Sequence, residues 1–311
     1  MKTAFIFPGQ GAQTVGMGAD VAQACPVAAA LFDQANEILG FDLKTICFEG
    51  PAEKLNSTTM SQPAIFVTSA ALLEILRTSP ATASVKPDVT AGLSMGEYTA
   101  LYAAGAVSFE DGLRLVRKRG EAMQAAADAT QGTMVSLIGL DEDKVRRLCD
   151  EARQGDLLEP VNFNCPGQIV VSGSLGACAR ALELAPTHGA AKAVRLEVAG
   201  GFHTSLMAGA AETLRQTLRQ TRISQPAAAP TIANINAEYY RTADEVVSGL
   251  TKQLTGAILW HKCMERLLTE GVEEFYEIGP GRVLTGLMKR INRKTRVTNV
   301  SDLASVKALV G

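Results

Sequence analysis

The chain has 311 residues, of which 47% are hydrophobic and 20% are charged, and its formal net charge is −2. This size and composition suit a soluble α/β protein with one large domain, or with such a domain carrying an insertion. The near-neutral charge excludes a general attraction to nucleic acid or to an acidic membrane, and no apolar run reaches the roughly eighteen residues of a membrane span.

The N-terminus and the cysteines predict a cytoplasmic protein. The apolar stretch in residues 1–8 is too short for a signal peptide and fits a strand, and no transit peptide is evident. A scattered set of cysteines without a C-x-x-C pair favours reduced, buried thiols over a zinc site. The set consists of Cys25, Cys47, Cys149, Cys165, Cys178 and Cys263. We expect no metal, no cofactor and a monomer.

The first part of the chain alternates apolar strands with helical stretches. Strands are expected at 3–7 and 88–93, and helices at 27–39, 62–77, 98–104 and 109–127. This alternation is typical of a parallel sheet with helices on both faces.

A change of rhythm follows Gln131-Gly132. Strands are expected at 133–139, 158–163, 168–172 and 191–198, and helices at 142–152 and 175–184. The order β-α-β-β-α-β is that of the ferredoxin-like unit. Gly200-Gly201 then marks a return to the main domain. We therefore predict a large α/β domain of residues 1–129 and 200–311, interrupted by a small α+β domain of residues 130–199. The cleft between them is the default site.

The last part of the chain returns to the first pattern. Helices are expected at 205–221, 243–254 and 261–270, with strands at 231–234 and 273–278. A turn at Gly279-Pro280-Gly281 precedes a final helix to about residue 292.

A serine between two glycines stands where the strand 88–93 meets the next helix, in Gly92-Leu93-Ser94-Met95-Gly96-Glu97. In a nucleophile elbow the serine occupies a sharp strand-to-helix turn, and small neighbours are needed because strand and helix crowd together. Unpaired N–H groups and the positive end of the helix dipole then face any oxyanion formed there. The same pattern also fits a small-residue turn in a parallel sheet, so alone it does not decide.

A serine nucleophile needs a base, and the chain has three histidines. His188 falls in a turn of the small domain and is expected to be solvated. His261 opens a helix and is expected at the surface or as a cap. His203 lies where the Gly200-Gly201 hinge meets a helix start, and it is therefore expected to project into the cleft.

A second glycine-rich turn, Phe7-Pro8-Gly9-Gln10-Gly11-Ala12-Gln13, follows the first strand. The third glycine of a dinucleotide fingerprint would fall on Thr14, and no G-K-S/T follows, so the pattern gives little support for nucleotide binding. Such a loop can instead lend a backbone N–H to an oxyanion hole, together with the N–H after the serine.

Taken together, these motifs resemble those of the malonyl-CoA:acyl carrier protein transacylase family. The resemblance covers Phe5 to about Arg290, in order and at family spacing. Its further elements are Gln62-Pro63-Ala64, Arg119-Gly120 with Met123-Gln124, Val161-Asn162-Phe163-Asn164, Gly-Phe-His at 201–203, and Glu277-Ile278-Gly279-Pro280-Gly281.

The resemblance implies an α/β-hydrolase-like parallel-sheet core with an inserted ferredoxin-like subdomain, and it implies roles for several residues. Ser94 is the nucleophile and His203 its general base. The main-chain N–H groups of Gln10 and Met95 form the oxyanion hole. The main-chain carbonyl of Gln253 orients the histidine.

The resemblance also implies how the substrate is held. The guanidinium of Arg119 pairs with the free carboxylate of malonyl, whereas Arg114, Arg117 and Lys118 form a solvated basic face. Phe202 disfavours branched acyl groups, since methylmalonyl-selective relatives carry a smaller residue there. Gln62 and Asn162 either contact the pantetheine arm or are buried polar residues of the interior.

The implied activity is ping-pong transfer of malonyl from malonyl-CoA to the phosphopantetheine thiol of acyl carrier protein, in fatty acid or polyketide synthesis. A serine hydrolase and a silent carrier-protein binding module are the alternatives. A basic run near the C-terminus is either a solvated face or a docking surface for an acidic carrier protein. We expect it on the C-terminal helix, and it consists of Arg282, Lys289, Arg290, Arg293, Lys294 and Arg296.

Overall fold

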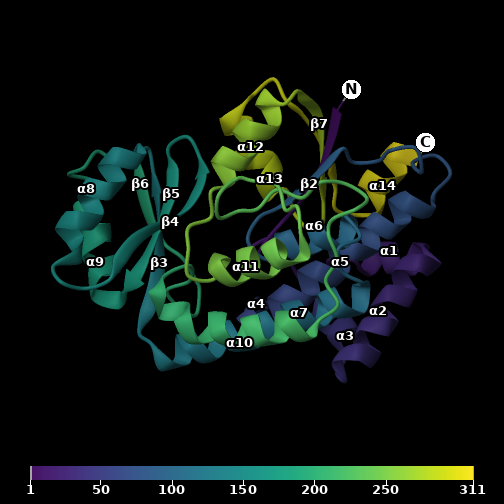
Figure 1. Ribbon diagram of the computed structural model, residues 1–311, viewed down its shortest axis with the longest axis horizontal. Coiled ribbons are helices and arrows are strands. Elements are labelled where there is room, and N and C mark those ends of the chain that lie inside the picture. Colours follow the sequence, from purple (N-terminus) through teal and green to yellow (C-terminus); the bar gives the residue numbers. More distant parts are fainter. Residues whose placement is uncertain (1, 311) are drawn as a thin grey trace.

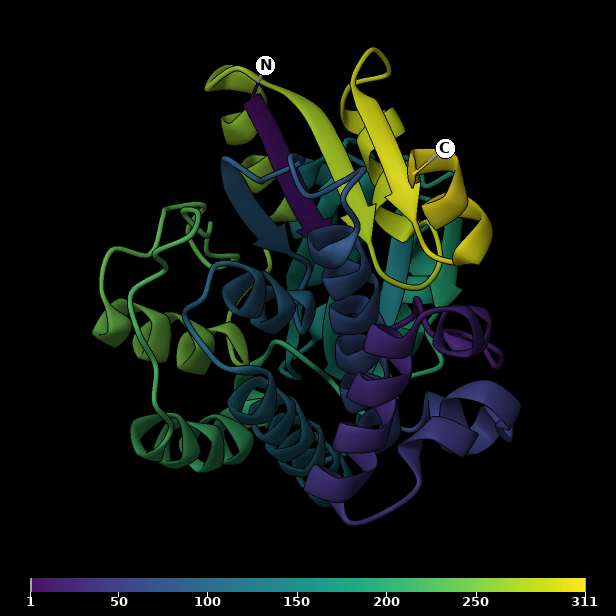
Figure 2. The ribbon, with the colours of Figure 1, turned by 90° about the vertical axis from the view of Figure 1, so that its right-hand side faces the viewer.

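The computed structural model describes residues 2–310, which form two lobes with one sheet each (Figure 1). The larger lobe contains a parallel sheet of order β2-β1-β7-β8, whose four strands lie side by side in Figure 2. Its strands are β1 (Lys2–Phe7), β2 (Val89–Gly92), β7 (Val272–Ile278) and β8 (Arg296–Val300). Phe7 pairs with Gly92, so the turns that follow β1 and β2 leave the same edge of the sheet side by side.

Helices cover both faces of this sheet, as predicted. Phe5 and Phe7 belong to the cluster on one face, while Ala4 and Ile6 belong to the cluster on the other, as strand alternation requires. The helices of this lobe are α1 (Ala19–Ala24), α2 (Pro26–Leu39), α3 (Leu43–Glu49), α4 (Ala52–Asn56), α5 (Thr58–Thr78), α6 (Gly96–Ala103), α7 (Phe109–Ala129), α10 (Ala208–Gln220, after a 3-10 turn at Ser205–Met207), α11 (Ala243–Gln253), α12 (Trp260–Thr269), α13 (Val283–Ile291) and α14 (Leu303–Val310).

Helix α5 is long and apolar enough to cross a membrane by length and composition alone, with a mean hydropathy of 1.3. However, 83% of that stretch is buried inside the protein, where α5 packs against α2 and α7, so it is a core helix. The helix begins at Thr58, four residues before the predicted start. Pro63 is tolerated in its second turn because it removes only one hydrogen bond near the helix end.

The smaller lobe contains an antiparallel sheet of order β4-β5-β3-β6, seen at the left of Figure 1. Its strands are β3 (Gly132–Ile138), β4 (Leu158–Cys165), β5 (Gln168–Ser174) and β6 (Lys192–Arg195), and its helices are α8 (Glu142–Arg153) and α9 (Leu175–Leu184). Each helix is preceded by a residue whose side chain caps it, Asp141 before α8 and Ser174 before α9. The predicted α/β fold with a ferredoxin-like insertion is confirmed.

The chain crosses between the lobes twice, after α7 and after β6. At the second crossing Gly200 lies so close to α7 that a Cβ atom there would stand 2.6 Å from the Cβ of Ala127. A glycine is therefore required by packing. The division of the chain at 129/130 and 199/200 stays a prediction.

Some predicted elements were wrong. Residues 231–234 do not form a strand: they make isolated bridges, Thr231 with Thr90 and Ile232 with Tyr239, before the chain turns back. Strand β6 ends at Arg195. Leu196 still donates to the Met134 carbonyl of β3, and residues 196–198 line the cleft. The short helices α1, α3 and α4 and the C-terminal pair β8 and α14 were not predicted.

Candidate active site

Ser94 lies on the turn between β2 and α6, in the left-handed region with a φ of 52°. Non-glycine residues are rarely held there, and such strain is common at functional sites. A Cβ on Gly92 would lie 2.0 Å from the carbonyl carbon of Gly96, and a Cβ on Gly96 would lie 2.2 Å from the carbonyl oxygen of Phe7. The predicted need for small residues on both sides of the serine is therefore met by direct backbone contact.

Asn234 holds this turn from the side. Its Oδ1 accepts a hydrogen bond from the Ser94 N–H at 2.7 Å, and its Nδ2 donates to the Gly92 carbonyl at 2.8 Å. The side chain is fully buried, so no water competes for these bonds. Asn234 thus satisfies two backbone groups that the sharp turn leaves without partners in the sheet.

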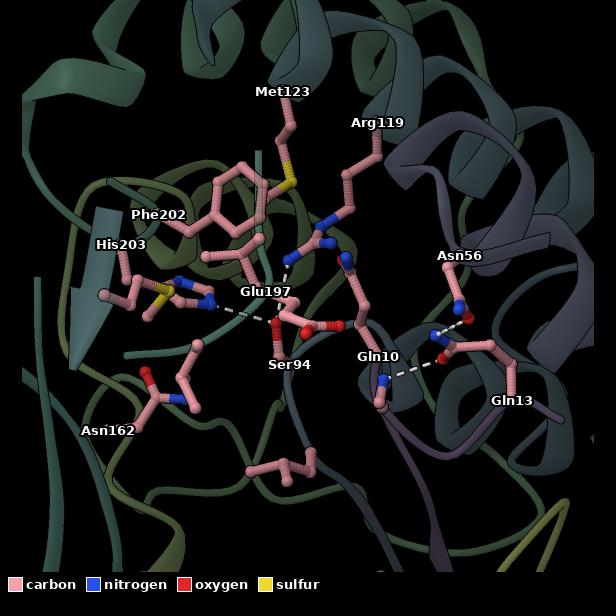
Figure 3. A pocket seen from close by; sticks show the side chains of 16 residues that line it. Gln10, Gln13, Asn56, Ser94, Arg119, Met123, Asn162, Glu197, Phe202 and His203 are labelled. Carbon is pink, nitrogen blue, oxygen red and sulfur yellow. Dashed lines mark hydrogen bonds between the residues drawn. The ribbon is translucent and has the colours of Figure 1, made fainter. Parts of the chain in front are cut away.

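His203 meets the serine from the second crossing between the lobes. Its Nε2 lies 3.0 Å from Ser94 Oγ, and its Nδ1 lies 2.7 Å from the Gln253 carbonyl oxygen (Figure 3). Since a carbonyl can only accept, Nδ1 carries the proton and Nε2 presents a lone pair to the hydroxyl. Burial, helped by the positive charge of Arg119, lowers the pKa of His203 to about 3, so the ring is a neutral acceptor at physiological pH.

Arg119 reaches the same hydroxyl from α7 although only 1% of it is exposed. Its Nη2 donates to Ser94 Oγ at 3.0 Å and to Gln253 Oε1 at 2.9 Å, and its Nη1 donates to Gln62 Oε1 at 2.9 Å. Its Nε has no partner within residues 2–310. All of these partners are neutral, so the cation lies beside the nucleophile without a direct ion pair.

The neighbouring basic residues of α7 differ from Arg119. Arg114 pairs with Glu110, and both Arg117 and Lys118 pair with Glu121; Arg114 and Lys118 are exposed, whereas Arg117 is half-buried and also donates to the Leu39 carbonyl. This is the solvated face that the sequence predicted. Of the four basic residues on α7, only Arg119 therefore lies on the buried face of the helix.

These groups open onto a cavity of about 470 Å³ between the lobes. Figure 3 shows Ser94, His203 and Arg119 meeting at its floor, with Phe202 and Asn162 on the walls. The lining residues are Gly9, Gln10, Gly11, Gln13, Asn56, Leu93, Ser94, Arg119, Met123, Met134, Asn162, Leu196, Glu197, Val198, Phe202 and His203.

The other predicted site residues are distributed around this cavity. Gln10 lines it, next to a loop that Gln13 fixes by accepting from the Gly11 N–H and donating to Asn56. The N–H groups of Gln10 and Met95 donate to no other group within residues 2–310. Asn162 lines the wall, and its Oδ1 has no partner within the same residues.

Gln62 does not reach the cavity. It is fully buried behind Arg119, accepting from Nη1 and contacting the Met123 sulfur with its Nε2. In this structure it therefore contacts the guanidinium, and the predicted contact with a pantetheine arm would require it to move.

Sequence reasoning missed Asn234, the side chain of Gln253 and any role for Glu97. Asn234 belongs to the segment wrongly predicted as a strand, and a strand position gives no indication that its side chain would bind the turn at Ser94. Glu97 stands within the elbow motif, and its burial could have been suspected from a charged residue in an otherwise apolar helix. The amide of Gln253 gave no signal in the sequence.

The remaining candidates lie elsewhere. His188 sits in a turn, with Nε2 2.9 Å from a Glu151 carboxylate oxygen, and His261 is the second residue of α12, with Nε2 3.2 Å from Glu265. No group of three or more His, Cys, Asp or Glu side chains within residues 2–310 is placed to hold a metal ion.

The prediction that the C-terminal basic run lies on one helix was wrong. Only Lys289 and Arg290 belong to α13, because that helix ends at Ile291. Arg290 donates to the turn at Pro166 and Gly167 in the small lobe, and Arg296 in β8 pairs with Glu274.

Comparison with protein families gives one match over nearly the whole chain. The family model described as "Acyl transferase domain" matches residues 4–306. The chain belongs to the acyl transferase family.

Several known acyl transferases are similar to this chain over nearly its full length. The malonyl CoA-acyl carrier protein transacylase of Bacillus subtilis (strain 168) is 42% identical over 310 residues, covering 99% of this chain and 96% of that protein. The structure of the malonyl CoA-acyl carrier protein transacylase from Coxiella burnetii matches with a TM-score of 0.95 at 35% identity, over 100% of this chain and 97% of that one. A malonyl-transacylase in complex with a type II PKS acyl-carrier protein matches with a TM-score of 0.94 at 38% identity, over 100% and 99%. The predicted family is confirmed.

Proposed function

We propose that this acyl transferase moves a malonyl group from malonyl-CoA to the phosphopantetheine thiol of an acyl carrier protein, through an ester on Ser94. The observation that carries the proposal is the buried Arg119, whose Nη2 lies 3.0 Å from Ser94 Oγ. A buried cation without an anionic partner is costly, and a substrate carboxylate would supply that partner. Full-length similarity to malonyl transacylases supports the same substrate.

In the first half-reaction Ser94 Oγ attacks the thioester carbonyl while its proton passes to His203 Nε2. The Gln253 carbonyl, 2.7 Å from Nδ1, stabilises the imidazolium that forms and fixes the ring orientation. The unpaired N–H groups of Gln10 and Met95 are suited to receive the oxyanion, and a single such donor contributes about 10²–10³ in rate. His203 then returns the proton to the departing coenzyme A thiol.

Arg119 has to change partners when malonyl binds. Its planar guanidinium can take a carboxylate with two parallel hydrogen bonds, which are stronger than those to neutral acceptors. Nη2 is now directed at Ser94 Oγ, and Nε has no partner but is shielded from solvent, so a shift of the guanidinium is needed for the two groups to take the carboxylate together. Gln62 keeps Nη1 in place during the exchange. The arrangement favours a dicarboxylic acyl group over acetyl.

The cavity walls set the remaining selectivity. Phe202 precedes His203 in the sequence, and its side chain lines the cavity. A branch on the α-carbon of the acyl group would therefore collide with its ring. Asn162 lines the cavity, and its side-chain amide is the polar group on this wall that a pantetheine arm would contact. Both contacts are independent of the chemical step.

The second half-reaction requires a carrier protein at the cavity mouth. The similar malonyl-transacylase in complex with a type II PKS acyl-carrier protein supports this partner. We propose a cytoplasmic monomer, because all six cysteines are free and all the named groups belong to one chain. The division into residues 1–129 with 200–311 and residues 130–199 belongs to the same proposal.

Intact-mass analysis after mixing with malonyl-CoA tests the first half-reaction. We expect one malonyl adduct on the peptide containing Ser94, and none on a Ser94→Ala variant. If Ser94→Ala still transferred malonyl at the parent rate, the protein would be a binding module whose serine has no chemical role.

Measuring free malonate against malonyl-carrier product, with both acceptors present, tests the second half-reaction. We expect the malonyl-carrier product to dominate. Dominant malonate would instead identify a serine hydrolase.

A further inference from the structure

We propose that Glu97 is a positioning residue that fixes the Gln253 amide, and through it sets both His203 and Arg119 for malonyl transfer. The proposal rests on the function proposed above. Glu97 lies in the first turn of α6, three residues after the serine, and is fully buried. None of the steps described above uses it.

Every hydrogen bond that Glu97 accepts comes from a neighbour of the site. Its Oε2 accepts from Gln253 Nε2 at 2.8 Å and from the Asn234 N–H at 3.2 Å. Its Oε1 accepts from the Tyr240 hydroxyl. Burial raises the pKa of Glu97 to about 7 against these hydrogen bonds. The Oε2 bonds persist in either protonation state, because a proton on Oε1 can be donated to the tyrosine oxygen.

The acceptor at Oε2 determines which way the Gln253 amide faces. Because Oε2 can only accept from it, Nε2 of Gln253 must point to Glu97, and Oε1 must then point to Arg119. In that orientation Oε1 accepts from Arg119 Nη2 at 2.9 Å. A flipped amide would oppose its NH₂ group to the guanidinium, so that two donors would face each other.

Gln253 also ties the nucleophile to the base. Its side-chain Nε2 donates to the Ser94 main-chain carbonyl at 3.0 Å, while its own main-chain carbonyl accepts from His203 Nδ1. One residue at the end of α11 therefore touches all three groups that meet at the cavity floor, and Glu97 holds that residue. Through Gln253, Glu97 affects the position of His203, which matters for every acyl group. It also affects the position of the Arg119 guanidinium, which matters for the rate only when the acyl group carries a carboxylate.

Burial alone does not explain this network, because the chain contains a matched carboxylate. Glu277 at the end of β7 is also fully buried, and burial raises its pKa as well. It accepts from the N–H groups of Leu284 and Thr285 at the start of α13, away from the cavity. Substitution of Glu277 therefore reports what loss of a buried carboxylate does to stability alone.

The test compares Glu97→Leu, Glu97→Gln and Glu277→Leu in the full chain, using the rate of Ser94 acylation by malonyl-CoA and by acetyl-CoA. Leucine removes the acceptor at similar volume, whereas glutamine can keep its oxygen toward Gln253 and its NH₂ toward the Tyr240 oxygen. We expect Glu97→Leu to lose about 100-fold with malonyl-CoA and about 10-fold with acetyl-CoA, the size of effect that a small misplacement produces. Glu97→Gln should restore the malonyl rate to within about threefold of the parent.

Glu277→Leu should lower the melting temperature while leaving the malonyl-to-acetyl ratio of the folded protein unchanged. Equal losses for both acyl groups in Glu97→Leu, or a Glu97→Gln variant as slow as Glu97→Leu, would overturn the positioning role. If Glu97→Leu does not fold, Glu97→Ala replaces it with the same expected split. A parent protein that forms no ester on Ser94 would instead refute the proposed function.

Discussion

The two lobes contribute unequally to the site. All groups that contact Ser94 Oγ, namely His203 and Arg119, come from the large lobe or from the segment that returns to it. From the strands of the small lobe only Met134 and Asn162 line the cavity. The large lobe thus provides the reacting groups, and the small lobe provides a wall that shapes the space for the substrate.

Backbone conformation shows the same contrast. In the large lobe Ser94 and His203 are held at φ values of 52° and 63°, and a third non-glycine residue with positive φ, Ala237 at 57°, lies in a turn that does not line the cavity. In the small lobe the one described non-glycine residue with positive φ is Gln154, which caps the end of α8. Strain at a helix cap is ordinary, whereas strain at two facing side chains is expected where geometry serves a reaction.

The largest difference between the two lobes is expected for substitution of His203. We expect His203→Ala to lower the rate of Ser94 acylation by about 10⁴-fold, because no other group can accept the hydroxyl proton. Single-turnover measurement with malonyl-CoA gives this rate. His188→Ala in the small lobe is the matched control and should keep the parent rate.

Arg119→Ala tests whether the large lobe also reads the acyl group. We expect kcat/KM for malonyl-CoA to fall by at least about 100-fold, since each of the two charge-assisted bonds contributes roughly 1.5–3 kcal/mol. Acetyl-CoA should be tolerated better than by the parent. An equal loss with both substrates would show that Arg119 has only a structural role, and Arg117→Ala, outside the cavity, should change neither.

Asn162→Ala tests the small lobe. We expect KM for malonyl-CoA to rise about fivefold with kcat unchanged, the effect of one neutral hydrogen bond. Steady-state kinetics separate the two constants. A loss in kcat comparable with that of Arg119→Ala would mean that the small lobe takes part in the chemical step.

The smallest effect is expected from pH. Because the folded pKa of His203 is about 3, the ring should remain neutral between pH 8 and pH 5, and the acylation rate should vary by less than about twofold. Imidazole ¹⁵N chemical shifts would show the protonation state directly. An imidazolium at pH 6 would contradict the desolvated site.

The lowered pKa of His203 also makes the folding stability depend on pH. The unfolded chain binds the His203 proton below about pH 6.5 and the folded chain only below about 3. The unfolded state therefore binds more protons in this interval, and His203 favours unfolding increasingly as the pH falls from 6.5 toward 3. Removing the imidazole should reduce the loss of stability on acidification, which denaturant unfolding at pH 5 would measure.

The sequence was most informative where one residue type is dictated by local geometry. The elbow around Ser94 and the hinge before His203 could be predicted because glycines mark both, and the ferredoxin-like unit followed from its order of elements. Gln253 was named only through resemblance, because a carbonyl carries no signature in its side chain. Asn234 and Glu97 could not be assigned, since their partners lie more than a hundred residues away and only the fold brings them together. The short helices α1, α3 and α4 have too few turns to show periodicity.

Gly9, Gly92 and Gly96 interlock beneath the nucleophile. A methyl group on Gly9 would meet the Leu93 carbonyl oxygen at 2.3 Å, just as methyl groups on the other two would meet main-chain atoms. Main-chain atoms cannot move aside as the tip of a flexible side chain can. Libraries that redesign this enzyme for new acyl groups should therefore leave these three positions fixed and place their diversity on the opposite wall.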